Sequence, residues 1–144
     1  MLNHFSIPKE SFNGPVLITG AGGCIGAWTT AMLLKANIEV IAFDLTSNKR
    51  RPELLISHEK LSKVPWVEGD ISNTETVIST IEKYKPESII HLAALQVPFC
   101  AADPTTGAKV NVVGTVNIME AARQNSIKRI SHASSMAAHS FIPG

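Results

Sequence analysis

The sequence predicts an α/β fold built on a doubly wound parallel sheet, and three observations predict it. Strand-like and helix-like patterns alternate over residues 15–135, which is the arrangement that places helices on both faces of a parallel sheet. The first apolar run, residues 16–18, passes directly into the glycine-rich stretch 19–26, which reads T-G-A-G-G-C-I-G. A second apolar run, residues 39–43, ends at Asp44. Together these features are typical of a Rossmann-type unit that binds a dinucleotide.

The glycine-rich stretch has the residues that a phosphate-binding turn needs. Gly20 permits a turn with positive φ, Gly23 lacks the Cβ that would hold a pyrophosphate away from the backbone, and Gly26 lets the next helix pack close to the strand. Asp44 follows Gly20 by 24 positions, where such a unit places the carboxylate that binds the adenosine ribose. A glycine-rich surface turn fits the same letters. Asp44 at the expected spacing is what favours nucleotide binding over such a turn.

Composition and charge limit the classes of partner. A chain of 144 residues suits one domain, and 13 basic against 12 acidic residues give a net charge of +1. This balance offers no electrostatic case for a nucleic-acid or membrane partner. Residues 1–9 lack the pattern of a signal peptide, and no stretch reaches the ~18 uninterrupted apolar residues of a membrane span. We expect a cytoplasmic protein that binds small molecules.

Cysteine and histidine spacing favours neither disulfides nor a metal site. Cys24 and Cys100 are too few and too far apart for a disulfide framework or a zinc site, and we interpret them as reduced thiols. None of the five histidines pairs with another at i, i+3 or i, i+4 near a carboxylate, so we expect no metal. Cys24 lies at the expected start of a helix, a position where thiols tend to be sensitive to oxidation.

The strands are expected where short apolar runs are bounded by turn residues. The five runs are residues 16–19, 39–43, 64–68, 88–92 and 129–134. The last is unusually polar for a buried strand because it contains Ser131 and His132. We predict the spatial order 3-2-1-4-5 with right-handed crossovers, which places the glycine turn at the switch point of the sheet. The sheet would then be truncated after the fifth strand, which becomes an exposed edge.

Helical spacing and capping residues predict the helices of the first half. The first helix follows the glycine turn and stops near Asn37. Its periodic face consists of Ile25, Trp28, Thr29, Met32 and Leu33. A loop over residues 46–52 is expected to precede a short helix over 53–61.

Capping signals also predict the later helices. Ser72 and Glu75 fit a capping box that opens a helix, and Pro86 prevents its continuation. After a loop over residues 93–102, Asp103 and Pro104 read as the N-cap and first residue of a long helix that reaches about residue 124.

Ligands of a doubly wound sheet bind beyond the carboxyl ends of its strands, so the residues just after each strand are the candidates. On pattern alone, Asp70 is as consistent with a residue that starts a helix as with an adenine contact. Ser134 and Ser135 are as consistent with a plain loop as with a functional role. The candidates are Gly20 to Gly26, Asp44, Asp70, Ile71, Ala93, Ala94, Ser134 and Ser135. They are small, acidic or hydroxylic, as contacts to a dinucleotide require.

Several motifs, in a fixed order, resemble the N-terminal half of an extended short-chain dehydrogenase/reductase of the NAD-dependent epimerase/dehydratase family. They cover most of the chain, from about residue 16 to residue 139. The motifs are Thr19-Gly20-x-x-Gly23-x-x-Gly26, Asp44, Gly69-Asp70-Ile71, His91-Leu92-Ala93-Ala94, Asn111-Val112-Val113-Gly114-Thr115 with Ala121-Ala122, and Ser134-Ser135.

The resemblance implies a role for each candidate. It implies that NAD is the cofactor and that the backbone around Gly20, Gly23, Cys24, Ile25 and Gly26 holds its pyrophosphate. It assigns the adenosine ribose to Asp44, the adenine to Asp70 and Ile71, and the central part of the cofactor to Ala93 and Ala94, and it places Ser134 among the cofactor-binding residues. Asn111 corresponds to a family asparagine near the cofactor, and Ser135 to the catalytic Ser or Thr that hydrogen-bonds the reacting oxygen of the substrate.

The chain departs from the family pattern at the substrate side. It has His139 where the family usually has tyrosine, and Ser140 where the family has glycine. The catalytic Tyr-x-x-x-Lys pair has no counterpart, because Tyr84 is the only tyrosine and belongs to another helix. We therefore expect residues 1–144 to be one NAD-binding domain, a fragment without the C-terminal substrate-binding portion, and to show no turnover alone.

The expected function is the NAD-binding portion of an epimerase/dehydratase-type oxidoreductase, which acts on a nucleotide sugar or related polyol by hydride transfer. The resemblance also implies that the complete enzyme can form a homodimer, since partner contacts in the family often involve the long helix, here residues 104–124, and the helix that follows it. Asp44 would repel a 2′-phosphate and so favours NAD over NADP, whereas Arg50 and Arg51 would either fold onto such a phosphate or form a solvated turn. The alternative function is a non-catalytic NAD(P)-binding or redox-sensing module in which Cys24 responds.

Overall fold

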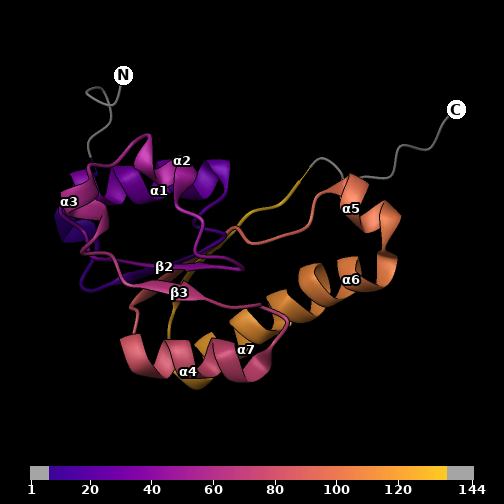
Figure 1. Cartoon of the computed structure of the whole chain (residues 1–144). Coiled ribbons are helices and arrows are strands. Elements are labelled where there is room, and N and C mark those ends of the chain that lie inside the picture. Colours follow the sequence, from indigo (N-terminus) through magenta and orange to yellow (C-terminus); the bar gives the residue numbers. More distant parts are fainter. Residues whose placement is uncertain (1–6, 136–144) are drawn as a thin grey trace, which may run out of the picture.

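The computed structural model describes residues 7–135 and contains one sheet of five parallel strands (Figure 1). The strands are β1 (Val16–Thr19), β2 (Val40–Asp44), β3 (Trp66–Glu68), β4 (Ser88–His91) and β5 (Arg129–His132). Their order is β3-β2-β1-β4-β5, and every neighbouring pair is parallel. The predicted fold class and strand order are therefore confirmed, with β1 at the centre.

Helices cover both faces of this sheet. They are α1 (Cys24–Lys35), α2 (Arg50–Glu53), α3 (His58–Leu61), α4 (Thr74–Tyr84), α5 (Val97–Ala102), α6 (Pro104–Ala108), the π-helical η3 (Lys109–Gly114) and α7 (Thr115–Gln124), with a short 3-10 helix η2 (Lys9–Ser11). Figure 1 shows α1 to α3 on one side of the sheet and α4 and α7 on the other. In the described part of the chain, no helix has the length and apolar character needed to cross a bilayer.

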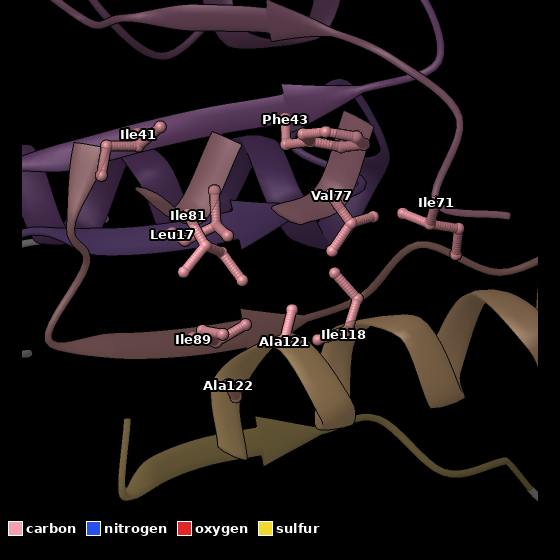
Figure 2. Packing of buried hydrophobic residues seen from close by; sticks show 10 residues of the cluster. All are labelled: Leu17, Ile41, Phe43, Ile71, Val77, Ile81, Ile89, Ile118, Ala121 and Ala122. Atoms are coloured by element: carbon pink, nitrogen blue, oxygen red, sulfur yellow. The ribbon is translucent and has the colours of Figure 1, made fainter. Parts of the chain in front are cut away.

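Each face of the sheet buries its own apolar core, because side chains alternate along a strand. On the α4 and α7 side, Leu17 and Ile89 pack with Ile81 and Ile118, and Phe43 fills the carboxyl end of the layer (Figure 2). On the α1 side, the core includes Val16, Ile18, Val40, Ala42 and Leu33. The near-continuous apolar strands thus follow from a sheet that is covered on both faces.

The expected face of α1 is confirmed at Leu33 but wrong at Ile25 and Trp28. Ile25 is 66% exposed and Trp28 is 37% exposed. The buried residues of α1 are Gly26, Ala27, Thr30, Ala31 and Leu33, of which Ala31 packs with Ile56 and Leu61. A Cβ at Gly26 would lie 2.1 Å from the carbonyl oxygen of Gly20. The helix approaches the strand so closely that small side chains are required, and residue size rather than hydrophobicity selects the buried face.

The connection between β2 and β3 also differs from the prediction. Residues 46–52 are not entirely loop, because α2 already begins at Arg50, and residues 53–61 hold the end of α2 and the separate turn α3 rather than one helix. Pro52 is buried within α2, which is allowed because the first turn of a helix needs no intrahelical N–H donor. The strand β3 begins at Trp66, later than predicted.

The helix α4 begins one residue later than the capping box requires, so the box formed by Ser72 and Glu75 is wrong. Asn73 is the N-cap, and its Oδ1 accepts a hydrogen bond from the N–H of Thr76 at 2.9 Å. Asparagine is as good an N-cap as serine. Ser72 instead donates its N–H to Oδ1 of Asp70 at 2.8 Å.

The long helix is confirmed in extent, although it is not uniform. Its N-cap is Asp103, which accepts a hydrogen bond from the N–H of Thr106, and its last residue is Gln124. Between α6 and α7 the hydrogen bonding is π-helical over η3. The region 93–102, expected as a loop, contains α5.

Within the described residues, β5 is an edge strand. Arg129, Ser131 and His132 are exposed, and Ile130 is partly buried. The prediction that the fifth strand is an exposed edge is confirmed.

We expect Ile118→Ala to lower the free energy of unfolding by about 2–5 kcal/mol, because it leaves a cavity between α7 and the sheet. Ile118 is 1% exposed, whereas Leu54, the C-cap of α2, is 79% exposed. Leu54→Ala should therefore change the free energy of unfolding by less than about 0.5 kcal/mol. Urea unfolding followed by circular dichroism measures both values, and equal losses in the two variants would contradict this packing.

Candidate functional site

A cleft of about 960 Å³ lies at the carboxyl ends of the strands. The turns after β1 to β4 and the residue after β5 meet there, as the parallel topology requires. Its lining includes ten of the predicted site residues, namely Gly20, Gly23, Cys24, Ile25, Gly26, Asp44, Asp70, Ile71, Ala93 and Ala94.

The glycine turn between β1 and α1 depends on missing side chains. Gly20 has φ of 73°, and a Cβ there would lie 2.8 Å from the backbone nitrogen of Ala93. Gly23 is the N-cap of α1 and donates its N–H to the carbonyl oxygen of Gly20 at 3.0 Å. A Cβ on Gly23 would meet that same oxygen at 3.1 Å, and apart from its neighbours along the chain no other described residue would lie within 4 Å of it. The space over Gly23 is therefore open for a ligand.

Asp44 links the end of β2 to this turn. Its Oδ2 accepts a hydrogen bond from the N–H of Gly22 at 2.8 Å. A carboxylate has two oxygens with about four acceptor sites, so Asp44 retains acceptor capacity toward the cleft. The hydrogen bond from Gly22 thus fixes the orientation of the Asp44 carboxylate, and its remaining lone pairs can accept hydrogen bonds from hydroxyl groups.

Two cations reach the same end of the cleft. Arg50 and Arg51 both line it, and Nη1 of Arg51 donates to the carbonyl oxygen of Gly22 at 3.4 Å. The helical turn α2 brings them there, since it carries both residues. The structure therefore places the arginines beside Asp44 rather than away from the cleft.

The turn after β3 is held in place by a hydrogen bond from Asn117 on α7. Asp70 lines the cleft and also accepts the N–H of Ser72, so it both borders the site and shapes the approach to α4. The carbonyl oxygen of Ile71 accepts a hydrogen bond from Nδ2 of Asn117 at 2.9 Å, and Oδ1 of Asn117 accepts from the hydroxyl of Thr74 at 3.0 Å. Asn117 is a positioning residue that sequence periodicity could not distinguish from a helical core residue.

Asn111 holds the turn after β4 in a similar way. Its Oδ1 accepts the N–H of Leu95 at 2.7 Å, and its Nδ2 donates to the carbonyl oxygen of Leu95 at 2.9 Å. Leu95 lines the cleft, whereas Asn111 is not among the lining residues. The structure therefore places this predicted cofactor residue behind the wall of the cleft.

Sequence reasoning missed the buried polar contact between His91 and Thr19. His91 is 1% exposed, and its ring contacts Thr19 on β1 and Thr115 on α7. Burial, and secondly the charge of His132 stacked 5.1 Å away, lower the pKa of His91 from 6.5 to about 4. The signal available in the sequence was a histidine and a threonine at the ends of two otherwise apolar strands.

The remaining candidates lie at the edge of the site. Ser134 and Ser135 follow β5 and are exposed, and the preceding Ala133 lines the cleft while neither serine does. Their roles stay predictions. His139 and Ser140 lie outside the described residues. Over residues 7–135, no group of three His, Cys, Asp or Glu residues could hold a metal ion.

A family model described as GDP-mannose 4,6 dehydratase matches residues 17–138 of the chain. The chain belongs to the NAD-dependent epimerase/dehydratase family of extended short-chain dehydrogenases/reductases. The resemblance inferred from the motifs is thereby confirmed. The match extends from β1 to beyond β5, so it covers all the turns that form the cleft.

Individual proteins support this assignment. The chain is 39% identical over 120 residues to a UDP-glucose 4-epimerase from Mycolicibacterium smegmatis, covering 83% of this chain and 38% of that protein. The structure of UDP-glucose 4-epimerase from Thermus thermophilus in complex with NAD matches with a TM-score of 0.68 and 29% identity, covering 81% of this chain and 36% of that one. An epimerase from Methanothermobacter thermautotrophicus matches with a TM-score of 0.79 and 26% identity, covering 94% and 40%. The chain thus spans at most about two fifths of the length of each.

We expect protonation of His91 to destabilise this epimerase/dehydratase domain below pH 6.5. The lowered pKa means that the unfolded state binds more protons than the folded state between about pH 4 and pH 6.5. The stabilisation from neutral His91 is therefore fully present above pH 6.5 and is lost as the pH falls toward 4. The total loss should be about 3 kcal/mol, at roughly 1.4 kcal/mol for each pKa unit. Urea unfolding in half-unit pH steps measures the slope.

The variant His91→Gln is the control for this pH dependence. It removes the titrating ring and should flatten the slope between pH 6.5 and about pH 5, where most carboxyl groups are still ionised. The same slope in wild type and variant would show that His91 does not fold in the neutral state.

Proposed function

We propose that this chain binds NAD in the cleft and forms the cofactor-binding part of an enzyme that epimerises or dehydrates a nucleotide sugar. The observation that carries the proposal is the meeting of the glycine turn and Asp44 at one end of a cleft of about 960 Å³. Family membership supports it, as do the solved epimerases that contain NAD. The same membership favours the enzyme over a redox-sensing module, although Cys24 is exposed and lines the cleft.

The residues present fit a dinucleotide. The open space over Gly23 lies at the start of α1, where free N–H groups and the helix dipole stabilise a pyrophosphate. Asp44 would accept the ribose hydroxyls with the lone pairs that Gly22 leaves free. Leu45 and Leu54 line the cleft and are more than half exposed, so they offer apolar surface to a flat base next to Asp70.

The chemistry follows from this placement. Bound NAD supplies the group that accepts and returns a hydride. The small side chains of Ala93 and Ala94 let the backbone approach the central part of the cofactor, and the segment is fixed by Asn111 behind it. Ser135 follows the edge strand at the carboxyl end of the sheet, where its hydroxyl would donate to the reacting oxygen of the sugar as charge develops there.

We expect the chain to bind NAD about ten- to a hundredfold more tightly than NADP, because Asp44 accepts the ribose hydroxyls and repels a 2′-phosphate. Asp44→Asn can retain the contact to Gly22 without the charge, and should reduce the preference to less than about threefold, since Arg50 and Arg51 then attract the phosphate. Isothermal titration calorimetry of the chain with both nucleotides measures the ratio.

The matched control is Glu39→Gln. Glu39 is exposed, directly precedes β2 and lies at the opposite end of that strand from Asp44, so this variant removes the same charge without touching the cleft. It should keep the wild-type preference. No NAD binding by the wild-type chain would overturn the proposed function, and tighter NADP binding would assign the cofactor choice to the arginines.

We also propose that the protein forms a homodimer through the long helix. Val112, Val113 and Val116 expose their side chains there, at 60%, 45% and 59%. Apolar groups grouped on one helix are a common feature of subunit contacts. Sedimentation velocity should show a dimer that Val112→Lys with Val116→Lys converts to a monomer, and a wild-type monomer at high concentration would contradict the proposal.

A further inference from the structure

His91 is the centre of a chain of hydrogen bonds that runs behind the wall of the cleft. Its Nδ1 lies 2.6 Å from Oγ1 of Thr19, and its Nε2 lies 3.1 Å from Oγ1 of Thr115. The lowered pKa keeps the ring neutral at pH 7. A neutral imidazole donates through one nitrogen and accepts through the other, so the partners decide which nitrogen carries the proton.

The hydroxyl of Thr19 settles the direction at Nδ1. Its Oγ1 accepts the backbone N–H of Leu92 and that of Ala93, each at 3.2 Å. A hydroxyl has two acceptor lone pairs and one hydrogen. With both lone pairs facing N–H donors, its hydrogen points to Nδ1 of His91, which accepts. The proton of the imidazole is therefore on Nε2.

From Nε2 the chain continues to the long helix and returns to the cleft. Nε2 donates to Thr115, whose hydroxyl donates to the carbonyl oxygen of Asn111 at 2.9 Å. The side chain of Asn111 holds both the N–H and the carbonyl oxygen of Leu95. The series of contacts thus begins on residues 92 and 93 and ends on residue 95, within one segment that lines the cleft.

We propose that His91, with its proton on Nε2, is the positioning residue that couples the contact of Thr19 with Ala93 to the contact of Asn111 with Leu95, and so fixes the wall against which the central part of the dinucleotide lies. This inference rests on the proposed binding of NAD. His91 itself is behind the wall and acts through the backbone of residues 92–95.

The opposite tautomer does not satisfy these contacts. With the proton on Nδ1, the hydroxyl of Thr19 would face three donors with two lone pairs, and the N–H of Leu92 or Ala93 would lose this acceptor. Leu92 has a second acceptor in the carbonyl oxygen of Thr19 at 3.1 Å. Ala93 would be the residue released, at the point where the wall meets the glycine turn.

Among residues 7–135, a charge on a neighbouring group acts on the ring of His91 through β5. His132 is the titratable group stacked on His91 at 5.1 Å, while β1 and α7 present the uncharged hydroxyls of Thr19 and Thr115. The contacts on these two elements therefore hold one arrangement over the pH range in which the ring of His91 stays neutral.

The first test needs no cofactor. A long-range ¹H–¹⁵N correlation spectrum of the wild-type chain at pH 7.5 should show His91 with Nε2 protonated and Nδ1 unprotonated. In Thr19→Val, amide hydrogen exchange at Ala93 should be faster than in wild type, because its acceptor is removed. A proton on Nδ1, or unchanged exchange at Ala93, would overturn the inference.

The second test measures NAD affinity by calorimetry on chains whose circular dichroism shows that they are folded. Thr19→Val should weaken NAD binding by about three- to tenfold, the range that loss of one hydrogen bond gives. Thr19→Ser retains the hydroxyl and should bind as wild type does. This rescue separates a positioning role from the loss of a methyl group or a general loss of stability.

Two control variants are available in the same chain. Thr30 on α1 is fully buried, and its hydroxyl has no hydrogen-bond partner among the described residues, so Thr30→Val makes the same change without breaking a contact. Ile81→Ala removes buried side-chain volume near the opposite end of the sheet, where Ile81 lines a second cavity. Both should bind NAD as the wild-type chain does.

The outcomes distinguish the two proposals. NAD binding by wild type that Thr19→Val does not weaken, or that Thr30→Val weakens equally, overturns the positioning role and leaves the proposed function standing. A wild-type chain that binds no NAD overturns the proposed function and the positioning role with it. Weakening in Thr19→Val alone, with rescue by serine and the Nε2 tautomer, supports the inference.

Discussion

The close approach of α1 to β1 is the constraint on which the rest of the structure depends. At Gly26, the helix passes so near the carbonyl oxygen of Gly20 that a single Cβ would stand 2.1 Å from it. This contact sets the height of α1 above the sheet, and with it the position of the free N–H groups at the start of the helix. It also agrees with the small size of Ala27 and Thr30, which are buried on that helix.

A second constraint comes from burying a polar ring in an apolar layer. His91 lies between the two helical layers, where a charged imidazole would lose its hydration. Thr19 and Thr115 satisfy both ring nitrogens, so the neutral form remains without an unpaired donor. A satisfied polar network of this kind specifies one arrangement of the strands and the helix, whereas apolar side chains of similar size would tolerate several.

The sequence allowed the strand order, the position of the glycine turn and ten residues of the cleft to be predicted, because each depends on short-range patterns and on the topology of parallel sheets. The face of α1 could not be read from hydrophobicity, since a steric contact with Gly20 decides it. Asn73 replaced Ser72 as the N-cap because either residue can accept the hydrogen bond, and only the approach of the chain selects one. The π-helical turn at η3 was not predicted from the helical spacing, and the contacts made from it, by Asn111 to Leu95 and by Gly114 beside Ile71, join residues outside the helix.

In the cleft, the residues that form the walls differ from the residues that hold those walls in place. The walls combine backbone and small side chains, at the glycine turn and at residues 93 and 94, with larger side chains such as those of Leu45, Leu54 and Arg51. The residues that hold the backbone parts lie behind the walls. They are Thr19, His91, Asn111, Thr115 and Asn117. The backbone parts suit the phosphates of a dinucleotide, which interact with N–H groups, while one carboxylate suits its ribose. An exposed side chain such as that of Ile25 can therefore change with small effect on the walls, whereas loss of a hidden hydrogen bond moves a whole segment of backbone. The amide of Asn111 shows this most directly, since it binds both polar groups of Leu95, and no single exposed residue of the cleft could replace it.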